Sequence, residues 1–119
     1  RSKRNQKMKV IYIAGKYTDK SKKAINHNID RAESISKRIW RNGMAAICPH
    51  LNTRNWNGIL SQDEFLEGYF SIVKKCDAVF MMDNWKKSEG AKAEHWLAAT
   101  YQIPIFYNIK DLKDWNHVV

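Results

Sequence analysis

Cysteine is scarce in this chain, and its pattern excludes a zinc site. Cys48 and Cys76 are the only cysteines among 119 residues. They lie near the ends of two predicted strands and lack the paired Cys or His spacing of a structural zinc site. His27 and His95, on predicted helices, also have no partner at ligand spacing. We therefore expect two reduced, buried thiols and no metal ion or cofactor.

Long apolar runs are also missing. No stretch approaches the roughly 20 apolar residues of a membrane span, and no charged leader followed by an apolar core resembles a signal peptide. Beyond the basic first residues there is no linker, repeat or low-complexity segment, and a hydrophobic content of 44% fits one compact core. We expect a cytoplasmic protein without a membrane partner and with one α/β domain over residues 8–119.

Acidic residues are fewer than basic ones, and much of the excess lies at the start of the chain. The 21 Lys and Arg residues outnumber the 12 Asp and Glu residues, for a net charge of +9. Residues 1–7 (RSKRNQK) lack apolar periodicity, which is typical of a flexible basic arm or of an artificial extension before a natural start at Met8. Such a segment suits phosphate-bearing partners, or only promotes solubility. Binding to nucleic acid is the weakest interpretation, because no recognition helix or base-stacking motif is present.

Short apolar runs alternate with segments of helical spacing. Predicted strands cover residues 8–14, 44–48, 77–83 and 103–107, and predicted helices cover residues 24–42, 61–75 and a segment from Ser88. Gly43 suits the left-handed end of the first helix, and Ser61 with Glu64 has the form of a capping box. Apolar strands without alternation are typical of a parallel sheet covered by helices on both faces. The order predicts a small, mostly parallel sheet in an α/β domain.

Four segments follow predicted strands and are expected to meet at one edge of the sheet. They are residues 14–17, 49–53 and 83–85 and the turn at Ser88. In open α/β sheets, ligands bind at the carboxyl ends of the strands, near the point where the strand order reverses. Ser88 is a natural N-cap, and the free amides behind it attract a phosphate or carboxylate. This edge is the predicted ligand site.

Glu94 lies almost two turns beyond Ser88 in the same predicted helix. Six residues at 1.5 Å each separate the two by roughly 9 Å along the axis, and Gly90, on the same face, leaves room above the carboxylate. An anion held near Ser88 could present a sugar to Glu94, which could attack the anomeric carbon or stabilise an oxocarbenium-like transition state. The alternative is a capped helix whose Glu94 is simply solvated.

In combination, the motifs resemble one known family. They are Tyr12-Ile13-Ala14-Gly15, Pro49-His50-x-Asn52-Thr53, Cys76-Asp77-Ala78-Val79, Trp85, and Ser88-x-Gly90-Ala91-x-x-Glu94. Together they resemble the nucleoside 2-deoxyribosyltransferase superfamily, above all its small members with the DUF4406-type pattern, which are often found in phages. The resemblance covers about residues 9 to 107, and its combination of motifs is more specific than any one of them.

This resemblance implies a flavodoxin-like or Rossmann-like three-layer fold and cleavage or transfer at the N-glycosidic bond of a nucleoside, nucleotide or ADP-ribose-like molecule. It implies that Glu94 is the nucleophile, that Tyr12 orients or assists it, and that Ser88 contacts a ligand phosphate. Further expected ligand contacts are Gly15, Lys16, His50, Asn52, Tyr69, Asn84, Trp85 and Gly90. Relatives build their site between two subunits, so a homodimer with shared sites is the expected assembly.

Two positions depart from the family pattern. Lys16 stands where relatives have a proline, and Tyr69 replaces an aspartate that helps to handle the proton going to the base. Losing that carboxylate removes a factor of roughly 10² to 10⁴ from acid–base catalysis, unless Asp63, Glu64 or Glu67 substitutes. Two interpretations stay open. The protein is an N-glycosidase or transferase, or it sequesters or senses a nucleotide without turnover, with Tyr69 stacked on the base, as a phage counter-defence factor would.

The other conspicuous side chains have simpler expected roles. Trp56 and Trp85, in loops at the ligand edge, are candidates for stacking on a base. Trp40 and Trp96 have helical positions that suggest packing. Asp77 starts a strand and is expected to anchor backbone there.

Overall fold

The computed structural model describes residues 7–49 and 58–117, apart from the side chain of Gln62. The predicted ligand residues His50 and Asn52 lie outside the described residues, as do Trp56 and residues 1–6 of the predicted basic arm. The element order is β1 (Val10–Ala14), α1 (Lys22–Arg41), β2 (Ala45–Ile47), α3 (Gln62–Val73), β3 (Ala78–Met81), the 3₁₀ turn η2 (Trp85–Lys87), α4 (Glu89–Thr100), β4 (Ile105–Phe106) and α5 (Ile109–His117).

The four strands form one parallel sheet in the order β2-β1-β3-β4. The chain runs from β1 to β2 on one side and returns to β3 on the other, so the strand order reverses between β1 and β3. In flavodoxin-like folds, ligands bind outside the carboxyl ends of the strands at this reversal. The predicted parallel α/β fold of the flavodoxin-like or Rossmann-like type is confirmed.

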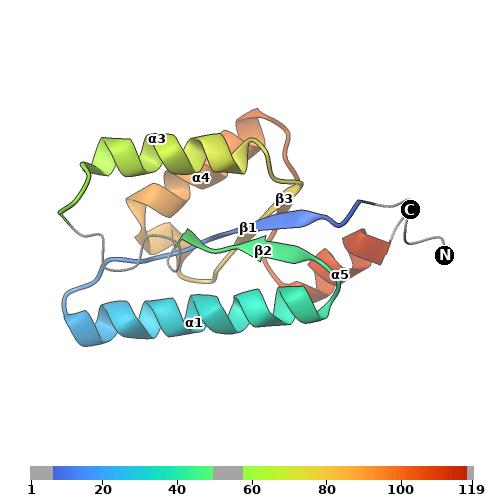
Figure 1. The fold of residues 1–119 in the computed structure, drawn as a ribbon, viewed down its shortest axis with the longest axis horizontal. Coiled ribbons are helices and arrows are strands. Elements are labelled where there is room, and N and C mark those ends of the chain that lie inside the picture. Colours follow the sequence, from blue (N-terminus) through green and yellow to red (C-terminus); the bar gives the residue numbers. More distant parts are fainter. Residues whose placement is uncertain (1–6, 50–57, 118–119) are drawn as a thin grey trace.

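Helices cover both faces of the sheet and make three layers (Figure 1). Helices α1 and α5 lie on one face, and α3 and α4 lie on the other. Successive strand residues point to opposite faces, so Ile11 and Ile13 enter the core under α1, whereas Tyr12 enters the core under α3 and α4. Because both faces are buried, the strands need no polar alternation. This explains the continuous apolar runs in the sequence.

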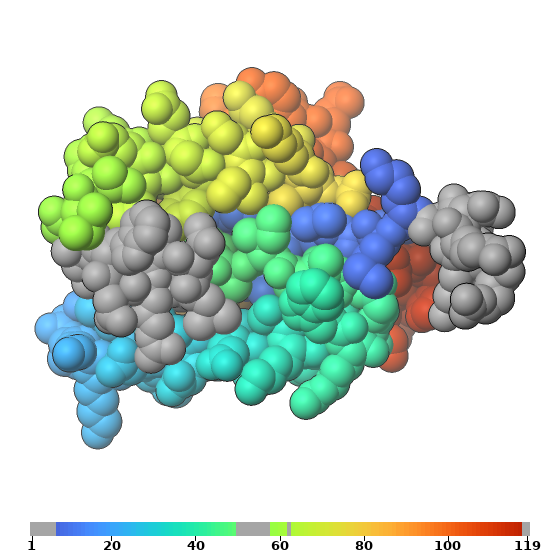
Figure 2. Space-filling view, viewed as in Figure 1, coloured from blue at the N-terminus to red at the C-terminus, as the bar shows by residue number. Residues whose placement is uncertain are grey.

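The space-filling view shows the same layers as a surface (Figure 2). Side chains of α3 form its upper part and those of α1 its lower part, with residues of β1 and β2 visible between them. Strand β2 is the edge of the sheet on this side, and its residues are half-buried. Within the described ranges, no helix combines the length and apolar composition that crossing a bilayer requires.

Three local features predicted from the sequence are confirmed: a capping box, a glycine at a helix end and an aspartate that anchors a strand. The Ser61 hydroxyl accepts a hydrogen bond from the Glu64 amide, and the Glu64 carboxylate accepts one from the Ser61 amide, which completes the capping box. Gly43 follows α1 with φ of +82°, a conformation that favours glycine. Asp77 anchors the start of the sheet, because its carboxylate accepts the Val10 amide at 2.7 Å.

Cys48 and Cys76 are buried and form no disulfide, as predicted. Burial raises the pKa of the Cys76 thiol to about 11. A thiol of that kind stays protonated and unreactive at neutral pH. The Cys76 side chain therefore serves as a small apolar group in the core.

Two expectations about packing are wrong. Trp40 is 54% exposed and Trp96 is 65% exposed, although their helical positions suggested burial. In α1 the neighbouring Ile39 takes the inward position, and in α4 Leu97 does. A difference of one residue rotates a helical side chain by about 100°, so spacing alone did not decide which of two adjacent apolar residues faces the sheet.

The end of the chain also differs from the prediction. β4 is limited to Ile105–Phe106, shorter than the apolar run of residues 103–107, and α5 was not predicted from the sequence. In α5, Leu112 is fully buried and Trp115 packs against Phe106 with ring centroids 5.1 Å apart. Tertiary contact therefore stabilises a helix of nine residues, which is too short to be stable alone.

Candidate active site

A buried pair formed by Tyr12 and Glu94 lies at the centre of the candidate site. Tyr12 comes from the middle of β1 and points to the α3 and α4 face, where Glu94 projects from the second turn of α4. The Tyr12 hydroxyl donates a hydrogen bond of 2.5 Å to the Glu94 carboxylate. Tyr12 is 0% exposed and Glu94 is 5% exposed. The alternative expectation, that Glu94 is a solvated helix carboxylate, is wrong.

Burial sets the electrostatics of this pair. It raises the pKa of Glu94 from 4.5 to about 7, because a charged carboxylate loses its hydration there, while the Tyr12 hydrogen bond opposes the rise. Burial and the adjacent carboxylate raise the pKa of Tyr12 well above its ordinary value, so the phenol remains a donor. Glu94 is therefore a carboxyl group that ionises near neutral pH, with a neutral partner that favours its ionised form.

Glu94 opens onto a cavity of about 350 Å³, a volume typical of small-molecule sites. The cavity lies where the chain leaves β1 and where α4 begins, at the predicted edge of the sheet. Its walls are Gly15, Tyr17 and Thr18 after β1, Pro49 after β2, Phe65, Leu66 and Tyr69 from α3, and Lys87, Ser88, Glu89, Gly90, Ala91 and Glu94 from the start of α4.

Ser88 caps α4 as predicted, and this places a helix N-terminus in the cavity wall. Its hydroxyl oxygen accepts the Ala91 amide at 3.1 Å, and the hydroxyl keeps its own proton for donation. The amides of Glu89 and Gly90 belong to the first turn, which has no intrahelical acceptors. Hydroxyl, amides and helix dipole together form a surface that suits an anionic group.

The two predicted glycine contacts both line the cavity, for different reasons. A Cβ on Gly15 would lie 2.6 Å from the Met82 sulfur and 2.9 Å from its Cβ, so glycine lets the end of β1 approach the residue after β3. A Cβ on Gly90 would lie 3.6 Å from Leu66, an ordinary contact. Packing therefore requires glycine at position 15, while at position 90 glycine only widens the space beside Glu94.

Tyr69 lines the cavity from α3, as expected for a ligand contact. Its hydroxyl donates to the Pro49 carbonyl oxygen at 3.4 Å, which links α3 to the segment after β2. Its ring lies 6.3 Å from that of Phe65, at an interplanar angle of 14°. The position where the resemblance implies an aspartate thus holds one of two nearly parallel rings in the cavity wall.

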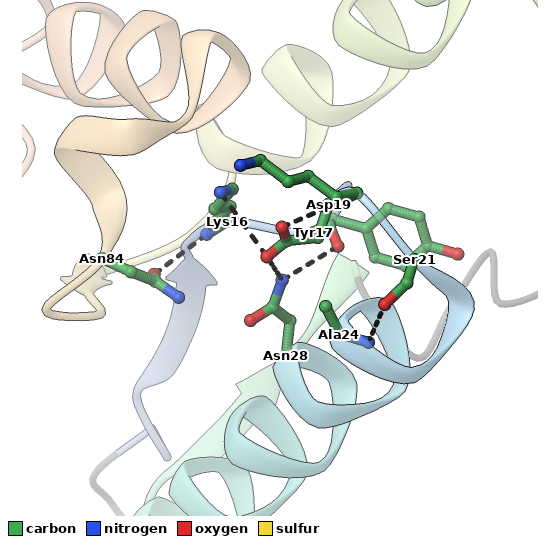
Figure 3. Close-up of polar contacts among 8 residues, drawn as sticks. Lys16, Tyr17, Asp19, Ser21, Ala24, Asn28 and Asn84 are labelled. Carbon is green, nitrogen blue, oxygen red and sulfur yellow. Dashed lines mark hydrogen bonds and ion pairs between the residues drawn. The ribbon is translucent and has the colours of Figure 1, made fainter.

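Lys16 and Asn84 flank the cavity but are not among its lining residues. Asn84 accepts the Lys16 amide at 3.0 Å, and the Lys16 ammonium pairs with Asp19 at 3.5 Å. Asn28 from α1 donates to the Tyr17 carbonyl and to Asp19 (Figure 3). The bond between Lys16 and Asn84 holds the loop after β1 against the loop after β3, and the Asn28 bonds hold the same loop against α1. Direct ligand contact by Lys16 or Asn84 stays a prediction.

Trp85 also lies outside the cavity wall. Its ring stacks on His95 with centroids 4.3 Å apart, and a His95 ring nitrogen is 2.8 Å from the Tyr107 hydroxyl. The stack connects η2, α4 and the segment after β4, and so stabilises the turn that leads into Ser88.

Among the described residues, no group of His, Cys, Asp and Glu side chains could hold a metal ion.

Eight lining residues were not predicted as catalytic residues or ligand contacts: Tyr17, Thr18, Pro49, Phe65, Leu66, Lys87, Glu89 and Ala91. In the sequence, Phe65 and Leu66 belong to the apolar stripe of a helix, and such a stripe is the same whether it packs or lines a cavity. Tyr17 and Lys87 are neighbours of predicted contacts, Lys16 and Ser88. Their proximity was the available signal, and loop geometry decided which neighbour faces inward.

Comparisons with known proteins agree with this fold. No curated protein matches the chain. The chain is similar to a solved structure of a 2-deoxyribosyltransferase from the psychrotolerant bacterium Bacillus psychrosaccharolyticus, with a TM-score of 0.58 and 16% sequence identity over 84% of this chain and 75% of that one. At this identity the likeness shows the fold alone. A family model described as a domain of unknown function, DUF4406, matches residues 9–107. Because that match spans most of the chain, the protein belongs to the DUF4406 family.

Proposed function

We propose that this protein cleaves or transfers the N-glycosidic bond of a nucleoside or nucleotide, with Glu94 as the nucleophile. The observation that carries the proposal is the Tyr12–Glu94 pair, a buried carboxyl group with a hydrogen-bond donor at the end of a small-molecule cavity. The similar fold of a 2-deoxyribosyltransferase supports the same class of chemistry. The capped start of α4 supports a ligand with an anionic group.

In the proposed reaction, Tyr12 holds one carboxylate oxygen of Glu94 and leaves the other free to face the cavity. The free oxygen forms a bond to the anomeric carbon while the bond from that carbon to the base nitrogen breaks. Water, or the nitrogen of a second base, then displaces Glu94 and completes hydrolysis or transfer. The tyrosine hydrogen bond favours the ionised nucleophile.

The two ends of the cavity have separate roles in this proposal. Ser88 and the first amides of α4 bind a phosphate, and the nearby Lys87 adds a positive charge. Glu94, almost two turns further along α4, faces the sugar. Phe65 and Tyr69 present their rings to the base. A five-prime nucleotide extends over these three groups in that order.

A second function is favoured by Tyr69, which replaces the family's aspartate. Among the described lining residues the acids are Glu89 and Glu94, and the Glu89 side chain is 93% exposed and paired with Lys92 at 2.7 Å. A cavity with one buried acid and three aromatic lining residues could bind a nucleotide tightly without turnover. Sequestering or sensing a signalling nucleotide is therefore the alternative.

We also propose that two copies associate, as the family resemblance implies. The exposed Trp96 on α4 and the exposed Tyr101 at the end of that helix support an interface between two copies. Analytical ultracentrifugation should give a dimer, and Trp96→Ser should weaken it. A wild-type monomer at high concentration would contradict this assembly.

The experiment that tests the function is a search for base release. Ribo- and 2′-deoxyribonucleosides and their five-prime phosphates are incubated with wild-type protein, with Glu94→Gln and with Glu33→Gln, and free base is measured by chromatography. Glu33 is a matched control because it lies on α1, on the opposite face of the sheet, where it pairs with Lys37. Release by wild type and the control, but not by Glu94→Gln, supports catalysis. Binding of a nucleotide that is recovered unaltered supports the alternative.

A further inference from the structure

We propose, on the basis of the proposed function, that the preferred substrates carry a flat cationic base of the pyridinium type instead of a neutral purine or pyrimidine. The structural basis is the juxtaposition, in one cavity, of the buried Glu94 carboxyl with the aromatic rings of Tyr17, Phe65 and Tyr69. Three properties of this cavity support the choice: the faces of its rings, the charge state of its carboxyl, and the proton demand of the leaving group.

The faces of the aromatic rings favour a cationic base. Phe65 and Tyr69 lie on successive turns of α3 with nearly parallel planes, 14° apart, and line the same wall. Aromatic faces carry negative electrostatic potential and attract cations. A flat cationic heterocycle gains both stacking area and this attraction, whereas a neutral base gains the stacking alone. The wall therefore prefers a positively charged ring among bases of similar size.

The charge state of Glu94 also favours a cationic base. Its hydrogen-bond partner is the neutral phenol of Tyr12, and no ion pair with Glu94 is found among the described residues. Lys87 lines the other end of the cavity, next to Ser88. A cationic ring near Glu94 would favour the ionised carboxylate and lower its pKa from about 7. Such a substrate converts the carboxyl into a nucleophile as it binds, and a neutral base does not.

A pyridinium leaving group also needs no general acid. When the bond between the anomeric carbon and a pyridinium nitrogen breaks, its electron pair goes to the nitrogen and neutralises the ring. The base leaves without a proton. A purine or pyrimidine leaves as an anion unless an acid protonates it, and Glu94 is the buried acid among the described lining residues. With Glu94 bonded to the sugar, water adds hydroxide to the anomeric carbon, releases a proton to solvent and regenerates the carboxylate.

The test compares leaving groups on one sugar. The probes are nicotinamide riboside and its five-prime phosphate, with adenosine, uridine and their phosphates as neutral-base counterparts, and the 2′-deoxyribose forms of each. We expect kcat/KM for nicotinamide release to exceed that for adenine or uracil release by on the order of 10², which is the contribution of a missing general acid. Release of adenine or uracil at an equal or higher kcat/KM would overturn this inference and leave the proposed function intact. Absence of release from every probe would overturn both.

Variants of one ring provide a second readout in the same chain. Phe65→Leu removes a ring face but keeps an apolar side chain, and Phe65→Tyr keeps the face. We expect Phe65→Leu to lower the preference for nicotinamide over adenine roughly threefold to fivefold, in line with cation–π attraction at a partly exposed site, and Phe65→Tyr to retain it. An equal preference in Phe65→Leu and wild type would overturn the assignment of this wall to a cationic base.

Discussion

The Tyr12 hydroxyl and the Glu94 carboxylate meet at 2.5 Å although 82 positions of sequence separate the two residues. The contact joins the central strand β1 to helix α4 and lies beneath the cavity that α3 and α4 enclose with the loop after β1. It therefore connects the stability of the fold with the chemistry of the site.

Replacing Glu94 by glutamine should abolish turnover while the fold is retained. The amide has nearly the shape of the carboxyl and can still accept the Tyr12 hydrogen bond, but it cannot form a glycosyl ester. We expect base release to fall by roughly 10³-fold or more, with Glu33→Gln unaffected. Chromatography of released base and circular dichroism measure the two properties. A folded Glu94→Gln variant with full activity would exclude Glu94 as the nucleophile.

The same variant should change how stability depends on pH. Because the pKa of Glu94 is raised from 4.5 to about 7 on folding, its stabilising contribution is fully present below about pH 4.5 and is lost as the pH rises through 7. Glu94→Gln stays neutral, so by pH 8 it should be more stable than wild type by about 3 kcal/mol. Urea unfolding at pH 4.5 and pH 8 measures the difference. An equal difference at both pH values would show that Glu94 is not buried as a carboxyl.

Tyr12→Phe should shift the pH dependence of catalysis. Its hydrogen bond lowers the pKa of Glu94, so losing the hydroxyl should raise that pKa further. We expect the ascending limb of kcat/KM, near pH 7 in wild type, to move to higher pH, with activity at pH 7 reduced by roughly 10-fold to 100-fold. Activity should recover in part at alkaline pH. A profile that keeps its midpoint but falls at every pH would assign Tyr12 a different role.

Ser88→Ala should weaken the binding of phosphorylated ligands selectively. We expect a loss of about 1 to 3 kcal/mol for a five-prime phosphate and little change for the unphosphorylated nucleoside, because a hydrogen bond to a charged group is lost. Removal of the N-cap also costs about 1 kcal/mol of stability. Ser61→Ala is the matched control, since Ser61 caps α3 and is not a lining residue. Calorimetry should find normal phosphate affinity in that control, and equal losses in both variants would contradict a phosphate site at Ser88.

Gly15→Ala and Gly90→Ala should have opposite effects on stability. The new methyl group at position 15 would overlap the buried Met82 side chain, at 2.6 Å from its sulfur, and overpacking of this kind costs about 1 to 3 kcal/mol. At position 90 the methyl group has ordinary contacts only, and alanine favours a helix over glycine by up to about 1 kcal/mol. Thermal unfolding compares the two. Equal destabilisation would contradict the close approach of β1 and β3.

Much of the fold could be predicted because its signals are local. Apolar runs without alternation identified the buried strands, and serine caps at positions 61 and 88 identified where helices begin. The left-handed conformation at Gly43 is likewise a property of one residue and its neighbours. These features depend on backbone geometry and hydrogen bonds within a few residues, so the order of the chain is sufficient to specify them.

The tertiary structure decided what local patterns left open. The sequence placed Glu94 on a helix but was equally consistent with a solvated carboxylate, and only packing against β1 buried it beside Tyr12. Packing also placed Phe65 and Tyr69 in the cavity wall and left Trp96 exposed. The physical reason is that helix rotation and layer packing are set by contacts between distant segments. Burial, hydrogen-bond partner and pKa are properties of those contacts and are not encoded in spacing along one element.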